Sequence, residues 1–172
     1  MVHSILRVVT ATSMRIVLWL VDHSNVCATQ DTLHCADLFV YHNTTNSGVN
    51  DVLPPGSNGT IQVYCDMESS GGGWTMISSA DINLDFFDAE SMTDYVNGMG
   101  PVFNDNGTES VDVWLGLKYL YSYTTITETT LRVEIYRCSA QASQTECIYD
   151  DFGILDEANG FAVNITKVEM AI

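Results

Sequence analysis

The chain has 172 residues, 46% of them hydrophobic, so it is long enough to bury one core and is most simply a single domain. Six Lys and Arg residues stand against 22 Asp and Glu residues, which gives a formal net charge of −16. No basic patch could neutralise phosphates, so the composition argues against nucleic acid and anionic membrane surfaces as partners. The acidic residues are dispersed along the chain, which favours a solvated acidic surface over an acidic tail.

Residues 1–28 have the features of a secretory signal peptide. Residues 16–21 are apolar, and a small-residue stretch typical of a cleavage site ends at Ala28. Arg15 interrupts the apolar stretch, so either translation starts at Met14 or the signal is atypical. Six apolar residues are too few to cross a bilayer, and we therefore expect no membrane insertion.

The cysteine count indicates an oxidising compartment. Cleavage after Ala28 would leave a mature domain, residues 29–172, with an even number of cysteines. Those cysteines are Cys35, Cys65, Cys138 and Cys147. Glycosylation sequons point the same way. They lie at Asn43, Asn58, Asn106 and Asn164. The sequence therefore predicts a secreted glycoprotein.

In chain order, the elements predicted before residue 81 are a short helix, a loop and a strand pair. Apolar residues at helical spacing predict the helix, which Asp31 or Thr32 could cap. The loop is rich in Asn, Ser, Gly and Pro and contains a brief extended piece. A Ser- and Gly-rich turn joins the two strands into an antiparallel hairpin. The ranges are 31–41 for the helix, 43–60 for the loop, 49–53 for its extended piece, and 60–67 and 73–80 for the strands.

The rest of the chain predicts one helix, a run that opens with alternating apolar residues, a hairpin and a final strand. Asp88 is placed to cap the helix and Gly98 to end it. In the alternating run we expect Trp114 in the core and residues 119–123 half-buried. In the hairpin, an alternating Leu, Val and Ile set should face the core. The ranges are 85–100 for the helix, 111–124 for the run, 129–138 and 146–152 for the hairpin, and 161–172 for the last strand.

The glycine run before Trp74 raises the question of a phosphate loop. No Lys is nearby, and a strand rather than a helix follows, so a nucleotide site is disfavoured. A turn with positive φ, closed against the buried Trp74 ring, is the preferred interpretation. The turn glycines are Gly71, Gly72 and Gly73.

No set of residues assembles an active site or a metal site. His34 and His42 lack a nucleophile-elbow motif around them and are expected to be surface or turn histidines. The acidic stretch 149–157 lacks the spacing of an EF-hand loop, so a solvated turn is preferred over a calcium site. We expect no enzyme activity, no metal and no cofactor.

The cysteines are better used in disulfide bonds than as metal ligands. Cys35 and Cys65 are expected to form one bond. Cys138 and Cys147 flank the predicted hairpin, and we expect them to face each other across it and form the second.

Residues 34–78 resemble the opening of a fibrinogen C-terminal-like domain. The shared pattern is S-G-V, P-x-G, V-Y-C-D-M and G-G-G-W-T, which stand here at 47–49, 54–56, 63–67 and 71–75. Later pieces agree in order, among them "VWLGL", with Trp114 and Gly116, and "LRVEI". The resemblance covers about residues 33–165.

The resemblance implies an α+β fold, with a small disulfide-bonded N-terminal unit followed by a twisted, mainly antiparallel sheet and one or two short helices. It also implies a secreted, non-enzymatic recognition or adhesion module of the kind found in ficolin-type lectins and extracellular matrix proteins, in cell adhesion and innate immunity. The expected partner is an extracellular protein or a glycan.

The family's calcium and ligand-binding subdomain has no counterpart in this sequence. We therefore expect a shortened domain without the acetyl-sugar site, whose last residues return to the middle of the main sheet. The alternatives are an extracellular interaction protein with no small ligand, or a truncated fragment of a full-length lectin-like protein.

Overall fold

The computed structural model describes residues 14–22, 32–81, 91–101, 112–137, 143–165 and 169–170. The strands of the main sheet are β1 (Met14–Asp22), β2 (Gly48–Val52), β3 (Ile61–Asp66), β4 (Trp74–Asp81), β5 (Val113–Trp114), β6 (Thr129–Arg137), β7 (Ser143–Tyr149) and β10 (Glu169–Met170). Their order is β10-β7-β6-β1-β4-β3-β2, with β5 paired to β4. Every neighbouring pair is antiparallel, which agrees with the predicted class.

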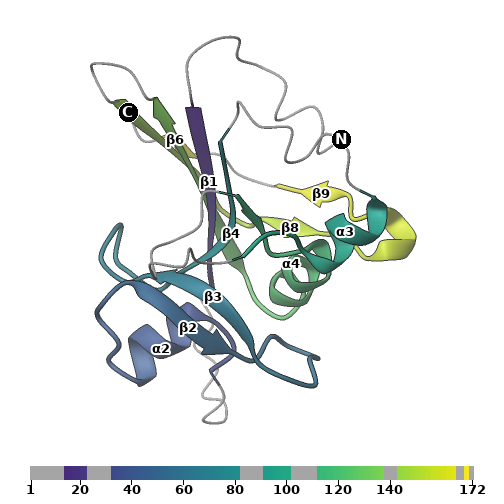
Figure 1. Ribbon diagram of the computed structural model, residues 1–172, viewed down its shortest axis with the longest axis horizontal. Coiled ribbons are helices and arrows are strands. Elements are labelled where there is room, and N and C mark those ends of the chain that lie inside the picture. Colours follow the sequence, from purple (N-terminus) through teal and green to yellow (C-terminus); the bar gives the residue numbers. More distant parts are fainter. Residues whose placement is uncertain are drawn as a thin grey trace.

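Short helices and one small strand pair complete the described fold. They are α2 (Cys35–Tyr41), α3 (Met92–Asn97), α4 (Leu117–Thr124), the 3-10 helix η2 (Glu157–Asn159), and the pair β8 (Gly153–Ile154) and β9 (Val163–Asn164). In Figure 1, β1 runs through the middle of the sheet, α2 lies with β2 and β3 at one end, and α3 and α4 lie together with β8 and β9. The sequence predicted one or two short helices, and the described residues hold three short α-helices. No helix in this part of the chain is long and apolar enough to span a membrane.

The N-terminal unit is built by α2 and its disulfide. Cys35 at the start of α2 is bonded to Cys65 in β3, with 5.5 Å between the two Cα atoms, which confirms the first predicted bond. The helix begins later than the sequence suggested. His34 is the N-cap, and the Asp37 carboxylate accepts the backbone N–H of Leu33 at 2.8 Å. The predicted caps at residues 31 and 32 were therefore wrong, because Asp37 fixes the start from inside the helix.

Helix α3 is shorter than the range predicted from its apolar spacing. Ser91 is its N-cap: the Ser91 hydroxyl accepts the N–H of Asp94, and the Asp94 carboxylate accepts the N–H of Ser91 in return. This reciprocal pair replaces the cap predicted at Asp88, which lies outside the described residues. Gly98 ends the helix with a φ of +100°, as expected.

Helix α4 is the element that the sequence pattern missed. The alternating apolar run ends at Gly116, whose φ of +113° few other residues adopt, and the chain then turns into a helix. Leu117, Leu120 and Tyr123 lie at helical spacing and are buried. Tyr123 is only 2% exposed, so the expectation that it is half-buried was wrong, and burial raises the pKa of its phenol. The predicted burial of Trp114 is confirmed.

The closing part of the sheet also differs from expectation. The stretch 161–172 is not one strand, because β9 pairs with β8 and β10 pairs with β7 at the edge of the sheet. The middle position is held by β1, from the segment predicted to be a cleaved signal. A segment removed by cleavage after Ala28 could not supply this strand.

Candidate functional site

The glycine turn joins β3 to β4 and is as tight as predicted. Gly71, Gly72 and Gly73 have φ values of +93°, +78° and +78°. A Cβ atom at Gly72 would lie 2.6 Å from the carbonyl oxygen of Met67, so no other residue fits there without movement. Directly after the turn, Trp74 begins β4 and is buried, with 5% of its surface exposed. The interpretation as a structural turn is therefore confirmed.

A buried arginine lies next to this turn. Arg132 in β6 has no exposed surface, and its guanidinium carbon lies 4.5 Å from the ring centre of Trp74 and 5.0 Å from that of Trp19. Strands β1, β4 and β6 each contribute one of these three residues. The two indole rings cover the cation and offer it favourable cation–π contacts.

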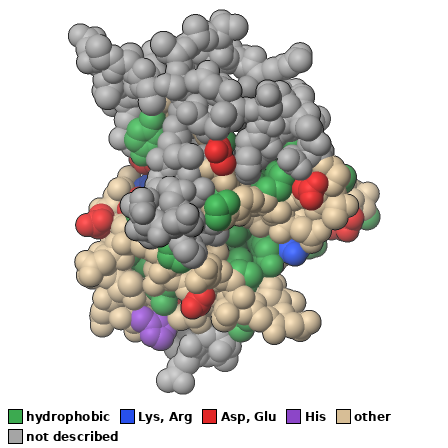
Figure 2. Space-filling model, viewed as in Figure 1, with side chains coloured by type: hydrophobic (Ala, Val, Ile, Leu, Met, Phe, Trp, Pro, Cys, Tyr) green, Lys and Arg blue, Asp and Glu red, His purple; other side chains and the backbone are tan. Residues whose placement is uncertain are grey.

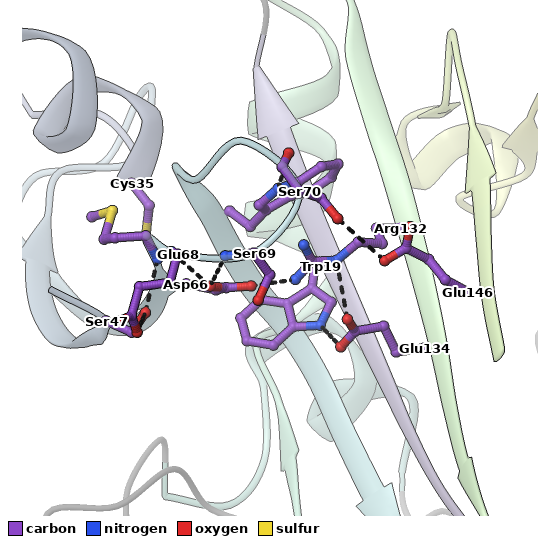
Figure 3. A network of polar contacts seen from close by, with 12 residues as sticks. Trp19, Cys35, Ser47, Asp66, Glu68, Ser69, Ser70, Arg132, Glu134 and Glu146 are labelled. Carbon is purple, nitrogen blue, oxygen red and sulfur yellow. Dashed lines mark hydrogen bonds and ion pairs between the residues drawn. The ribbon is translucent and has the colours of Figure 1, made fainter. Parts of the chain in front are cut away.

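Asp66, at the end of β3, neutralises this arginine. The Arg132 Nη2 atom donates to Asp66 Oδ2 at 2.6 Å, and Asp66 Oδ1 accepts the backbone N–H groups of Glu68 at 3.1 Å and Ser69 at 3.0 Å (Figure 3). Burial acts to raise the pKa of Asp66, but these hydrogen bonds outweigh it and hold the pKa below its usual value. The carboxylate therefore stays charged at neutral pH.

Glu134 is the second buried acid of the network. Its Oε2 atom accepts a hydrogen bond from the Trp19 indole at 2.6 Å and one from the Tyr136 hydroxyl at 2.9 Å. Its other oxygen lies 3.5 Å from Arg132 Nε. Glu134 is thus held in one orientation from three directions, and residues from β1 and β6 are tied together.

An open hollow of about 470 Å³ lies beside this network. It is lined by residues from β1, β3, β6 and β7 and from the glycine turn, among them Trp19, Tyr64, Glu68, Glu134, Tyr136 and Glu146. Two hydroxyls orient its outer carboxylates: Ser47 donates to Glu68 at 2.8 Å, and Ser70 donates to Glu146 at 3.3 Å (Figure 3). Carboxylates and phenol rings together suit a positively charged group rather than an anion.

The described part of the chain holds no cluster of metal ligands. Among the described residues, no three His, Cys, Asp or Glu side chains come together as a metal would require. Acidic side chains are dispersed over the face shown in Figure 2.

The second predicted disulfide is not formed, and Cys147 carries a free thiol. In the β6–β7 ladder Cys147 lies opposite Val133, whereas Arg137 lies opposite Ser143. Cys138 falls outside the described residues. The prediction required the two cysteines to lie opposite each other, but the position opposite Cys147 is held by Val133, so the register of the ladder explains the error.

The structure does not bring the remaining predicted residues together into one site. His42 is exposed, as expected, but His34 is 5% exposed and lies 3.6 Å from Asp37, so the surface interpretation was wrong for it. In the acidic stretch, Asp156 accepts the N–H of Asn159 and caps η2. Three of the four sequon asparagines are exposed, and Asn106 lies outside the described residues. The exposed ones are Asn43, Asn58 and Asn164.

Sequence reasoning missed Arg132 and Glu134 because it assigned the hydrophobic residues of β6 to the core. Arg132 and Glu134 are 0% and 3% exposed, whereas Val133 and Ile135 between and beside them are only partly buried. The predicted core face is right, because Leu131 is buried and Val133 packs against the larger core cluster. The opposite face is buried as well, which the pattern did not indicate, because charged residues are seldom fully buried unless paired. The signal that could have found these residues is the presence of opposite charges. Arg132 and Glu134 stand two positions apart in one predicted strand, and Asp66 supplies a further acid next to Cys65.

Residues 32–170 match the family model of the fibrinogen beta and gamma chains, C-terminal globular domain. The chain belongs to this family. The human fibrinogen alpha chain is 34% identical over 137 residues, which are 78% of this chain and 15% of that protein. Bovine fibrinogen-like protein 1 is 30% identical over 131 residues, which are 76% of this chain and 39% of that protein. The chain thus spans well under half the length of these relatives.

Solved structures show the same fold. The fibrinogen-like globe domain of human ANGPTL6 superposes with a TM-score of 0.63 at 21% identity, over 85% of this chain and 60% of that one. The lamprey fibrin D-dimer, complexed with the peptide Gly-His-Arg-Pro-amide, superposes with a TM-score of 0.61 at 18% identity, over 86% of this chain and 46% of that one. The fibrinogen-related domain therefore has the predicted α+β architecture.

Proposed function

We propose that this chain is a non-enzymatic recognition or adhesion module that acts outside the cell and binds a protein partner. The support is its membership of the fibrinogen-related family, whose matched relatives, fibrinogen, fibrinogen-like protein 1 and the angiopoietins, are secreted extracellular recognition proteins. The disulfide between Cys35 and Cys65 suits the same compartment.

The hollow is the surface that we propose for contact with the partner. The observation that carries this proposal is that its carboxylates are already oriented. Ser47 donates to Glu68 and Ser70 to Glu146, whereas Glu134 accepts two hydrogen bonds and lies next to the Arg132 cation. A pre-oriented site loses less conformational entropy on binding. The chemistry fits a basic side chain of the partner, which carboxylates attract and phenol rings can stack upon.

A charge-matched binding experiment tests this surface. We expect a labelled hexa-arginine peptide to bind, and Glu68→Gln or Glu146→Gln to weaken binding by about threefold each, as for partly exposed ion pairs. The control is Glu157→Gln, because Glu157 is exposed in η2 and lies outside the hollow. Equal affinity for wild type and all three variants would show that the hollow is not the binding surface.

We further propose that the chain does not bind acetylated sugars in the calcium-dependent manner of the lectins in this family. The support is that, among the described residues, no three His, Cys, Asp or Glu side chains come together, and that the hollow suits a positively charged group. The test is retention on immobilised N-acetylglucosamine with calcium and with a chelator. We expect no retention in either buffer, and calcium-dependent retention that free N-acetylglucosamine reverses would favour the lectin alternative.

The second candidate is an extracellular interaction protein with no small ligand. Under this alternative neither the sugar nor the basic peptide binds, whereas the recognition proposal requires binding of the peptide.

A further inference from the structure

β1, the strand at the centre of the sheet, lies outside the part of the chain that the family model matches. The match begins at residue 32, whereas β1 ends at Asp22. β1 nevertheless pairs with β6 along its whole length, from Met14 opposite Arg137 to Asp22 opposite Thr129, and with β4 along its other edge. The fibrinogen-related part of the chain therefore receives its central strand from a preceding segment.

Three side chains of β1 are core residues. Val17 is 1% and Trp19 is 4% exposed, and both pack in a cluster with Trp74 and Met76. Leu20, 4% exposed, belongs to the other and larger cluster. Since successive side chains of a strand point to opposite faces, β1 is buried on both faces of the sheet, unlike a strand added at an edge.

Two buried charges also depend on β1. The Trp19 indole donates to Glu134, and its ring covers one side of Arg132. Without β1, Glu134 would lose a buried donor and Arg132 would lose one of the two rings that enclose it. The facing edges of β4 and β6 would also expose rows of unpaired backbone groups.

We infer that β4 and β6 form a strand-binding slot whose occupant is residues 14–22 of the same chain, and that this segment stays in the mature protein. Backbone hydrogen bonds along both edges hold the strand, and the sites of Val17, Trp19 and Leu20 select its sequence. The inference does not rest on the proposed recognition function. Export would then depend on a leader outside residues 14–22.

The first test cuts the connection to β1 in the full chain. A specific protease site is inserted between residues 24 and 30, the purified protein is cut, and the fragments are followed by native gel filtration and mass spectrometry. We expect both fragments to elute together with the mass of a single chain. A larger fragment that stays folded after the smaller one has separated would overturn the slot. A stable dimer held together by exchanged β1 strands would overturn the same-chain occupant.

The second test compares a buried with an exposed valine. Val17→Asp should lower the melting temperature by on the order of 10 °C, and Val17→Ala by about 5 °C. The matched changes at Val40, which is 61% exposed in α2, should shift it by less than about 2 °C. Should Val17→Asp fail to fold, Val17→Ala and the cutting experiment decide the outcome. Equal changes in melting temperature for the matched substitutions at Val17 and Val40 would contradict the inference.

The third test identifies the first residue of protein recovered from the culture medium. We expect a folded species that contains Met14. A folded species that begins at Thr29 would overturn the inference, because it would lack β1.

Discussion

The guanidinium of Arg132 lies 2.6 Å from the carboxylate of Asp66, although the two residues are 66 positions apart in the chain. Arg132 belongs to β6, next to the central strand β1, and Asp66 ends β3, which carries the disulfide to α2. This ion pair therefore fixes the N-terminal unit onto the sheet.

Replacing Asp66 by Asn keeps the shape of the side chain and one acceptor for the turn amides but removes the charge. Arg132 is then buried without its carboxylate, so we expect a loss of on the order of 3 kcal/mol in the free energy of unfolding at pH 7. Urea unfolding measures this loss. Glu157→Asn, at an exposed position, is the control and should be close to neutral. A loss at Asp66 no larger than that of the control would contradict the role of the pair.

The same variant predicts a pH dependence. The pKa of Asp66 is lowered in the folded protein, so its contribution is complete above the unfolded value of about 4 and disappears as pH falls through the folded value. The difference in unfolding free energy between wild type and Asp66→Asn should be constant from about pH 6 to 8 and shrink below about pH 4. A difference that grows on acidification would have the wrong sign.

The bond between Trp19 and Glu134 should appear as a coupling energy. Trp19→Phe removes the donor and Glu134→Gln removes the charge of the acceptor, and the pair is separated by 2.6 Å in a buried setting. A double-mutant cycle should give a coupling of about 1.5 kcal/mol. Trp19→Phe combined with Glu157→Gln should be additive. Additivity in both cycles would mean that the hydrogen bond contributes nothing to stability.

Alanine substitutions at two neighbouring glycines distinguish the cost of backbone strain from the cost of steric contact. Gly71 and Gly72 both have positive φ, but a Cβ at Gly71 meets open space, whereas one at Gly72 would lie 2.6 Å from the Met67 carbonyl and 2.7 Å from the Phe39 ring. Gly71→Ala should cost about 1 kcal/mol, and Gly72→Ala clearly more, on the order of 3 kcal/mol. Thermal unfolding ranks the two variants, and equal losses would show that α2 yields freely to the added atom.

Alkylation distinguishes the cysteines. In denaturant without reductant, Cys147 should react with iodoacetamide, whereas Cys35 and Cys65 should react only after reduction. Peptide mass spectrometry reads each site. A protected Cys147 would restore the disulfide with Cys138. Reduction of the bond between Cys35 and Cys65 should cost about 3 to 4 kcal/mol on the chain-entropy account, because it closes a separation of 30 residues.

Local signals in the sequence predicted most of the regular elements. The strands around residues 61–66 and 74–81 followed from alternation, and the turn between them from consecutive glycines, because these features are decided by neighbouring residues. Helix α4 was missed since its apolar side chains continue an alternating run without a polar N-cap. A single positive φ at Gly116 makes the change from strand to helix.

The candidate site was harder to predict because its contacts join distant parts of the chain. Trp19 looked like part of a signal peptide, and only the sheet order shows that it meets Glu134. Asp66 and Arg132 each resemble ordinary surface charges until the fold pairs them. The hairpin register that places Cys147 opposite Val133 likewise depends on how β6 and β7 align.

The position of β1 has a consequence for the order of folding. β1 leaves the ribosome before its two neighbours, and its partner β6 begins more than a hundred residues later, as in the contact between Trp19 and Glu134 that spans 115 positions. The centre of the sheet therefore cannot close until synthesis has passed residue 137. Until then one edge of the apolar strand β1 has no partner, so slow folding and a dependence on chaperones are expected from topology alone.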